Sequence, residues 1–301
     1  MTFPGDPVPS EAAVSAPIPD AGELALIARR VAERAAEHVR HRRGELFAPT
    51  GTRTADASVS AKSTPTDPVT VADTETEALV RELLHAERPG DEVLGEEAGG
   101  SLTVPTGVRW VVDPIDGTVN FLYGVPAYAV SVAAQVDGRS VAGAVVDVAR
   151  GVTYWSWSGG GAWAAGLTAE PVRLQCNPIS DLSLALIATG FAYSRRRRER
   201  QGALIAQMLP RVRDIRRVGA AALDLCMVAS GAVDAHFEHG LSPWDWAAGG
   251  LIAAEAGAVV TLPPADSRSA DGHVTIAAAP GIAAAFEAAL GAADGLSTIG
   301  E

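Results

Sequence analysis

Trp110-Val-Val-Asp-Pro-Ile-Asp-Gly-Thr-Val-Asn-Phe121 is the most informative stretch of the chain, because it places two carboxylates at the end of an apolar run. Residues 108–112 are rich in β-branched side chains, which predicts a buried strand. Asp113 and Asp116 follow it, and carboxylates this close repel each other unless a cation lies between them. The turn also brings the carbonyl of Ile115 toward them. Oxygen ligands suit Mg²⁺, although an ordinary turn with Asp113 as a helix cap is the alternative.

Gly117 and Thr118 come directly after these aspartates. If a short helix begins here, the backbone N–H groups of both residues can bind a phosphate group. Gly117 has no side chain to block a close approach, and the hydroxyl group of Thr118 can position a water molecule. The stretch therefore predicts a metal ion and a phosphate group side by side.

Further acidic residues occur where elements are expected to begin or end. Glu96 and Glu97 follow a predicted strand at residues 93–94, Asp245 opens an apolar helix at residues 243–256, and Asp73 lies in the first turn of a helix at residues 69–86. Each has an ordinary alternative as a solvated turn or a helix-start acid. The flanking Trp244 and Trp246 favour burial of Asp245, and a buried carboxylate needs a partner.

The bulk composition excludes several classes of protein. With 301 residues, 48% hydrophobic and 20% charged, the chain is expected to be globular, as one domain or two closely packed ones. We expect neither a membrane span nor a secretory signal. Cys176 and Cys226 are expected to be reduced and buried, and these features together favour the cytoplasm. The net charge of −12 argues against nucleic acid as a partner.

The pattern of elements changes along the chain. We expect a disordered tail at residues 1–18, an N-terminal α+β part at 19–170 and a C-terminal α/β part at 171–301 that completes a shared cleft. The expected helices are at 21–43, 69–86, 196–209, 221–230, 243–256 and 281–290. The expected strands are at 93–94, 108–112, 127–136, 140–147, 152–156, 161–165, 182–189, 214–217, 235–238, 259–262 and 274–278.

Several of these segments together form a known pattern. Lys62-x₄-Asp-x₂-Thr-x₂-Asp73, Gly95-Glu-Glu97, Trp110–Phe121 and Pro243-Trp-Asp-Trp-Ala-Ala-Gly249 occur in this order. The chain thereby resembles the inositol monophosphatase family, of the bacterial inositol-1-monophosphatase type, from about residue 21 to about residue 290. The resemblance implies a layered α-β-α-β-α sandwich of the sugar-phosphatase (fructose-1,6-bisphosphatase-like) type, with an antiparallel N-terminal sheet and a mixed C-terminal sheet. It also implies a lithium-sensitive homodimer.

The resemblance assigns roles to the acidic residues. Two to three Mg²⁺ ions are implied, with Glu96, Asp113 and the Ile115 carbonyl on the first. The second ion would be bound by Asp113, Asp116 and Asp245, and the third by Glu96 through water. Thr118 with Asp73 would activate the attacking water, and Gly117 with Thr118 would bind the phosphate.

The resemblance places the substrate contacts largely in the second half of the chain. The segment Arg216-Arg-Val-Gly-Ala-Ala221 matches the family pattern, so Arg216, Gly219, Ala221 and Glu238 are assigned to a polyol pocket. Glu96, Asp116 and Asp245 also face the substrate, and Asp116 would touch a ring hydroxyl. Ala220 replaces the Thr or Ser often found at its position. Lys62 matches a lysine in a mobile loop that closes over the metals, after a long polar loop at residues 48–61.

Two other features have simpler interpretations. The arginine-rich run at residues 195–200 is interpreted as a solvated helix start rather than a nucleic-acid site. His236 and His239 have a spacing found in metal sites, but they fall on a predicted strand and turn and are interpreted as structural or surface residues.

The leading hypothesis is Mg²⁺-dependent hydrolysis of inositol 1-phosphate to inositol and phosphate by a metal-activated water. The alternatives within the same chemistry are histidinol phosphate, nucleotide 3′-phosphates and fructose 1,6-bisphosphate as substrates. The alternative of a different class is a regulatory binding protein. Pocket residues rather than metal ligands decide among the substrates.

Overall fold

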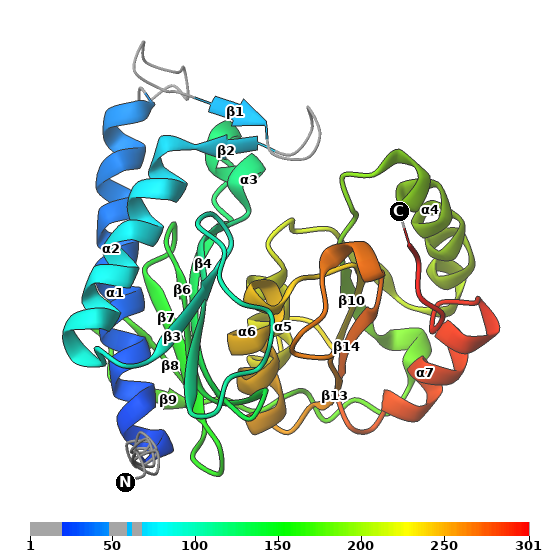
Figure 1. Ribbon diagram of the computed structural model, residues 1–301. Helices are drawn as coiled ribbons and strands as arrows, with labels where there is room; N and C mark the ends of the chain where they lie inside the picture. The colour runs from blue at the N-terminus through cyan, green and yellow to red at the C-terminus, as the bar shows by residue number, and fades with distance from the viewer. Residues whose placement is uncertain (1–19, 48–58, 62–67, 301) are drawn as a thin grey trace, which may run out of the picture.

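The computed structural model describes residues 20–47, 59–61 and 68–300 (Figure 1). The expected tail at residues 1–18, most of the loop at 48–61, and Lys62 lie outside the described residues. Within these ranges the helices are α1 (Ala21–Leu46), α2 (Val71–Glu87), α3 (Thr118–Tyr123), α4 (Arg195–Met208), α5 (Ala221–Ala229), α6 (Pro243–Glu255) and α7 (Ala283–Ala292).

The strands of the first half form a seven-stranded sheet in the order β3-β4-β5-β6-β7-β8-β9. They are β3 (Glu92–Gly95), β4 (Val108–Asp116), β5 (Ala129–Val136), β6 (Arg139–Asp147), β7 (Val152–Trp157), β8 (Gly161–Gly166) and β9 (Val172–Arg173). From β4 onward the neighbours are antiparallel, as expected. β3 and β4 are instead parallel. Residues 96–107 between them form a connection long enough to return the chain to the end of the sheet at which β3 begins. A separate pair of short strands, β1 (Val59–Ala61) and β2 (Pro68–Thr70), precedes α2.

The second half forms a five-stranded sheet in the order β11-β10-β12-β14-β13. Its strands are β10 (Leu186–Thr189), β11 (Asp214–Arg216), β12 (Ala235–His239), β13 (Val259–Thr261) and β14 (Val274–Ala278). β10 runs parallel to both β11 and β12, whereas β14 is antiparallel to β12 and β13. The expected mixed sheet is therefore confirmed.

Helices cover both faces of each sheet, which gives the expected α-β-α-β-α layers (Figure 1). One hydrophobic cluster joins α1 and α2 to the outer face of the seven-stranded sheet. A second contains α5 and α6, which lie between the two sheets. A third packs α4 and α7 against the far face of the five-stranded sheet. This second cluster is rich in alanine, whose small side chains let α5 and α6 pack closely between the two sheets.

Local sequence explains where the helices begin. The side chain of Asp20 accepts a hydrogen bond from the N–H of Gly22 and caps α1. α6 begins with Pro243, and Ser242 and Asp245 form a capping box around it. Asp245 is thus held by the start of the helix before any ligand is considered.

Two elements differ from their expected bounds. The strand expected at residues 182–189 begins with a 3₁₀ turn, Leu182–Leu184, because Asp181 caps it by accepting from the N–H of Ser183. The strand expected to end at residue 112 continues to Asp116, with an irregularity in its pairing to β5 between Asp113 and Asp116. This irregularity turns both aspartate side chains to the same region.

Gly272 packs closely against the C-terminal segment at Ile299. Gly272 has φ +71°, and a Cβ atom there would lie 2.2 Å from the carbonyl oxygen of Ile299. We expect Gly272→Ala to reduce the free energy of unfolding by about 2–4 kcal/mol, from left-handed strain and overpacking together. Gly202 lies in α4 with no atom within 4 Å of its Cβ position, so Gly202→Ala should instead stabilise by about 0.5–1 kcal/mol. Urea unfolding of both variants measures the difference.

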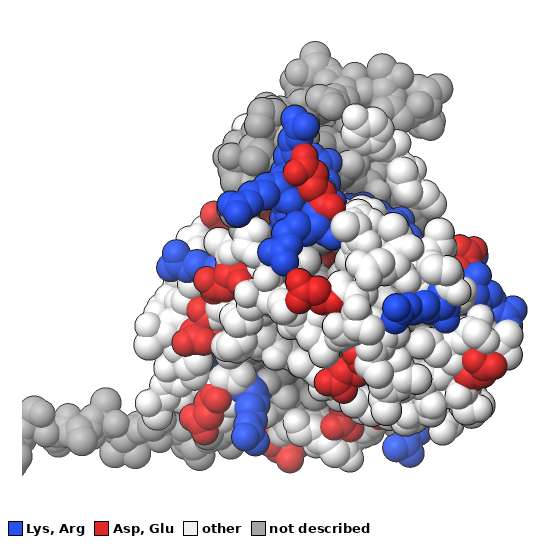
Figure 2. Space-filling view, turned by 90° about the vertical axis from the view of Figure 1, so that its right-hand side faces the viewer, with Lys and Arg blue, Asp and Glu red and all other residues white. Residues whose placement is uncertain are grey.

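The arginine-rich start of α4 has a mixed-charge environment. Arg195 pairs with Glu199 and Arg200 with Asp294. Arg197 is buried and donates to the carbonyl oxygens of Ser269 and Ala270. Figure 2 views the side of the molecule on which α4 and α7 lie, and it shows basic side chains gathered in the upper part with acidic ones among and below them. This pattern agrees with a solvated helix start that has one structural arginine.

Cys176 and Cys226 are both free and buried, as expected. None of the helices in the described ranges combines the length and the apolar character needed to cross a bilayer.

Candidate active site

The Trp110–Phe121 stretch contains the end of β4 and the start of α3, close to the points where α5 and α6 begin. Asp113, Ile115 and Thr118 are all buried. Asp113 Oδ1 accepts a hydrogen bond from the N–H of Ile115 at 3.0 Å, which fixes its carboxylate beside the turn. Gly117, with φ +89°, is the cap of α3, and a Cβ atom there would lie 2.9 Å from the carbonyl oxygen of Ala127. Only glycine fits this position without a shift of the backbone.

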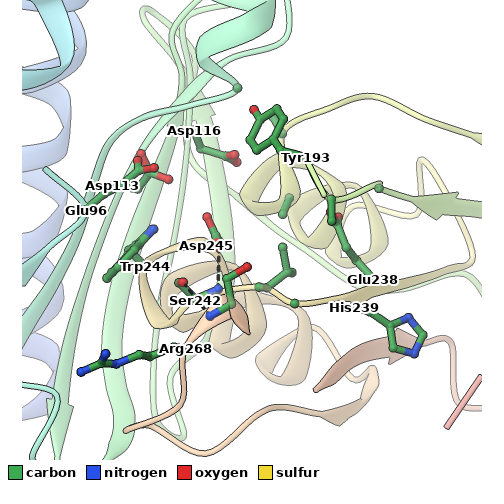
Figure 3. A pocket seen from close by; sticks show the side chains of 18 of the residues that line it. Glu96, Asp113, Asp116, Tyr193, Glu238, His239, Ser242, Trp244, Asp245 and Arg268 are labelled. Carbon is green, nitrogen blue, oxygen red and sulfur yellow. Dashed lines mark hydrogen bonds between the residues drawn. The ribbon is translucent and has the colours of Figure 1, made fainter. Parts of the chain in front are cut away.

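Three carboxylates from distant segments converge on one point. Single oxygen atoms of Asp113, Asp116 and Asp245 all lie within 4.8 Å of one another. Figure 3 shows Glu96 beside Asp113 on the same side of this space, while the carboxylate of Asp245 points into it from below. Glu96 follows β3, whose parallel pairing with β4 places the ends of the two strands together.

Hydrogen bonds position two of these carboxylates. Asp245 Oδ2 accepts from the N–H of Ser242 at 2.7 Å. Asp116 Oδ2 accepts from the N–H of Ala222, at the start of α5, at 2.7 Å. The second bond joins the seven-stranded sheet to the second half of the chain, so the cluster depends on both halves.

The cluster is electrostatically unfavourable without a cation. Burial raises the pKa of Asp116 to about 7, and the charge of Glu96 adds to this effect. Burial raises the pKa of Asp245 well above its usual value, and the charges of Asp116 and Glu96 raise it further. Buried carboxylates that raise one another's pKa in this way are arranged as ligands for a cation. Their all-oxygen chemistry suits a hard ion such as Mg²⁺.

Thr118 and Asp73 form the pair that the sequence resemblance implied. The hydroxyl oxygen of Thr118 lies 3.0 Å from both Asp73 Oδ1 and the carbonyl oxygen of Ile115. Its single proton can be donated to only one of them, so the lone pairs of the oxygen stay available to another donor. Asp73 is completely buried and also accepts from the backbone N–H and the hydroxyl of Thr70.

A cavity of about 590 Å³ opens beside the cluster. Among the residues that line it are the expected Glu96, Asp113, Ile115, Asp116, Gly117, Thr118, Gly219, Ala221, Glu238 and Asp245. Figure 3 shows Glu238 and Tyr193 across the cavity from the clustered carboxylates. Its size suits a small ligand rather than a polymer.

Arg216 lies apart from these residues. It is exposed, and its Nη1 donates to Asp214 Oδ2 at 2.6 Å. Arg217 lines the cavity instead. Asp214 and Arg216 are two residues apart and therefore share a face of β11, whereas Arg217 is the first residue after this strand.

Arg217 is held over the cavity wall by its neighbours. Its guanidinium carbon lies 6.0 Å from the centre of the Phe191 ring. A Cβ atom on Gly219, which has φ +93°, would lie 2.3 Å from Arg217 Nη1, so the guanidinium group lies directly on the Gly219 backbone. The charge of Arg217 opposes the rise in pKa of both Asp116 and Glu238.

Further residues of the site escaped the sequence analysis. A Cβ atom on Gly190 would lie 2.1 Å from Glu238 Oε2, so only glycine leaves room for this carboxylate. Asn120 Nδ2 donates to the carbonyl oxygens of Ala127 and Val218 at 2.8 and 2.9 Å, and thereby joins the start of α3 to the segment that contains Arg217. The sequence motif includes this Asn-Phe ending, but the structural role of Asn120 depends on residues about a hundred positions away in the chain.

Comparisons with known proteins agree with this geometry. The model of the inositol monophosphatase family matches residues 20–294. An inositol-1-monophosphatase of Mycobacterium leprae is 54% identical over 290 residues, which cover 95% of this chain and 99% of that protein. A Nus factor SuhB of Vibrio cholerae is 38% identical over 196 residues, covering 65% and 72%.

A solved structure shows the same fold. Mycobacterium tuberculosis SuhB matches with a TM-score of 0.77 and 48% identity, covering 92% of this chain and 99% of that one. The family match extends over the described carboxylates and the cavity. This chain therefore belongs to the inositol monophosphatase family.

Proposed function

We propose that this protein is a Mg²⁺-dependent phosphatase that hydrolyses inositol 1-phosphate to inositol and phosphate. The observation that carries the proposal is the buried Asp113–Asp116–Asp245 cluster beside the Thr118–Asp73 pair, in a cavity of small-molecule size. The name of the Mycobacterium leprae relative supports inositol 1-phosphate as the substrate.

The family resemblance implies two to three Mg²⁺ ions, and the oxygen ligands present suit this ion. Asp113, Asp116 and Asp245 would bind them, together with Glu96 and the carbonyl oxygen of Ile115. Mg²⁺ at this position would supply positive charge to the phosphate and lower the pKa of the attacking water.

The phosphate end of the reaction depends on three residues of this chain. The N–H groups of Gly117 and Thr118 lie at the start of α3, where they can donate to phosphate oxygens. The Thr118 hydroxyl donates to Asp73 Oδ1 and can then accept a hydrogen bond from the attacking water, which orients a lone pair of that water toward phosphorus. Asp73, buried behind Thr118, is the group that can accept the proton.

The opposite wall would bind the inositol ring. Burial raises the pKa of Glu238 to about 8, which favours the protonated carboxyl group, and in that form it offers both a donor and an acceptor to ring hydroxyls. Arg217 supplies donors beside it, Gly219 leaves room for the guanidinium group of Arg217, and Ala221 leaves space for the ring.

We expect Arg217→Ala to lower kcat/KM for inositol 1-phosphate about tenfold or more, because a hydrogen bond to a charged donor contributes about 1.5–3 kcal/mol. Arg216→Ala removes an identical side chain from the adjacent position outside the cavity and should change kcat/KM less than about twofold. Steady-state kinetics of the two variants provide the comparison. An equal loss in both would contradict the placement of Arg217 at the substrate.

A panel of substrates tests the proposed function. Phosphate release should be fastest with inositol 1-phosphate, slower with histidinol phosphate, fructose 1,6-bisphosphate and adenosine 3′,5′-bisphosphate, and absent in EDTA. Millimolar Li⁺ should inhibit the reaction. A higher kcat/KM for histidinol phosphate would identify that compound as the substrate and leave the proposed hydrolytic chemistry unchanged. Mg²⁺-independent turnover would contradict the metal assignment.

A regulatory binding role is the second candidate, because the Vibrio cholerae relative is named a Nus factor. It predicts a biological effect that survives the loss of activity, so an inactive variant that fully complements a deletion strain would favour it. From the family resemblance we also infer a homodimer in the cytoplasm, which size-exclusion chromatography with light scattering and cell fractionation would test.

A further inference from the structure

A second group of possible metal ligands lies behind the substrate wall of the cavity. Asp224 on α5 and His236 and Glu238 on β12 each contribute one donor atom, and these atoms all lie within 4.8 Å of one another. His236 and Glu238 are two residues apart on the strand and therefore point to the same face, toward α5. The neighbours of His236 in the sheet are Ala188 and Ala277, which are small and leave space beside the imidazole.

Two members of this group are buried without hydrogen-bond partners. Asp224 and His236 are both completely inaccessible to solvent. In the part of the chain that the structure describes, neither carboxylate oxygen of Asp224 and neither ring nitrogen of His236 has a hydrogen-bond partner. Asp224 Oδ2 and His236 Nδ1 lie 3.8 Å apart, too far for a hydrogen bond.

Buried polar groups without partners destabilise the fold unless a ligand binds to them. Each buried polar group without a partner costs about 1–3 kcal/mol. Burial raises the pKa of Asp224 well above its usual value, with a further contribution from the charge of Glu238, and burial lowers the pKa of His236 to about 3. His236 is therefore neutral at physiological pH, the state in which an imidazole binds metals. A divalent cation would partner all three side chains at once.

We propose that Asp224, His236 and Glu238 form a binding site for one divalent transition-metal ion of the Zn²⁺ type, separate from the Mg²⁺ cluster. One imidazole nitrogen with two carboxylate oxygens is a donor set for zinc or manganese rather than for magnesium. Donors about 2.1 Å from a common ion lie about 3.4 Å apart in a tetrahedron, so the group needs to contract slightly. Glu238 is only half-buried and lines the cavity, which provides the route of entry.

Occupation of the site would have a consequence for the reaction. Glu238 belongs both to this group and to the wall that faces the inositol ring, so a bound ion would withdraw its carboxylate from the substrate. Zn²⁺ should then raise KM more than it lowers kcat. This consequence rests on the proposed function, whereas the binding site itself does not.

Metal content tests the proposal directly. The full-length protein is equilibrated with Zn²⁺ in a large excess of Mg²⁺, freed of unbound ions and measured by mass spectrometry of metals. The wild type should retain one more Zn²⁺ per chain than His236→Phe. His239→Phe alters another buried histidine of β12 whose side chain points to the opposite face, and it should retain the full amount.

A second variant guards against a folding defect. Asp224→Asn keeps the shape of the side chain and removes its charge, so it should also lose the extra ion, and thermal melting in EDTA checks that each variant is folded. If the wild type retains no more Zn²⁺ than the folded Asp224→Asn variant, the proposal is wrong. Asp224 and His236 are then only a buried polar pair. Phosphatase activity is measured in parallel without zinc: its absence in a wild type that still binds the extra ion would overturn the proposed function alone.

Discussion

Asp113→Asn is expected to abolish divalent-metal-dependent turnover while the protein remains folded. Asn keeps the size of the side chain and the oxygen that accepts from the N–H of Ile115, but it removes one of the three clustered negative charges. Charge stabilisation by a metal is worth several kcal/mol, which corresponds to a loss of at least about 10³-fold in kcat/KM. Phosphate-release assays over a range of Mg²⁺ concentrations measure the loss.

The same variant makes a prediction about stability. Because it relieves repulsion between Asp113 and its neighbours, its melting temperature in EDTA should equal or exceed that of the wild type. Asp137→Asn is the matched control, since Asp137 lies in a turn with φ 49° that asparagine tolerates. Full activity of Asp113→Asn, or an equal loss in Asp137→Asn, would sink the assignment of the cluster.

Thr118→Ala is expected to reduce kcat by about 10²–10³-fold with little change in the Mg²⁺ concentration needed for half-maximal activity. The hydroxyl group lies 3.0 Å from Asp73 Oδ1, and we propose that it orients the attacking water. The clustered carboxylates do not depend on this hydroxyl, so metal affinity should remain. Kinetics at saturating substrate with a Mg²⁺ titration separate the two effects.

Thr118→Ser provides the control for this experiment. Serine keeps the hydroxyl and loses only a methyl group, so kcat should stay within about tenfold of the wild type. A serine variant as inactive as the alanine variant would show that the methyl group or the local packing matters rather than the proton relay.

Much of the fold was predictable because the elements have strong local signals. The expected strands at 140–147 and 274–278 match β6 and β14 closely, since apolar runs there are separated by clear turns. The parallel pairing of β3 with β4 was not predictable, because it depends on the end of the sheet to which the connecting loop returns the chain. The start of β10 differs from its expected position because the cap by Asp181 competes with an apolar run.

The residues of the site also divide into those that the sequence indicates and those that only the fold brings together. Asp113, Asp116 and Asp245 were identified from their unusual position beside apolar residues and from the family pattern, and the structure brings them together. The family pattern points to Arg216, whereas the structure places Arg216 beside Asp214 outside the cavity and Arg217 at the cavity wall. Contacts such as that between Gly190 and Glu238 join segments far apart, and no local pattern indicates them.

The hydrogen bond from the N–H of Ala222 to Asp116 marks a boundary between two sets of residues that can evolve separately. On one side, β4 and α6 contain the clustered carboxylates on which we propose that hydrolysis depends. On the other side, Phe191, Arg217 and Glu238 line the cavity wall that we propose to face the leaving alcohol. Substitutions on the second side can change which alcohol is released and preserve the hydrolytic residues. A mutant library confined to these three positions is therefore a direct route to phosphatases with new specificities.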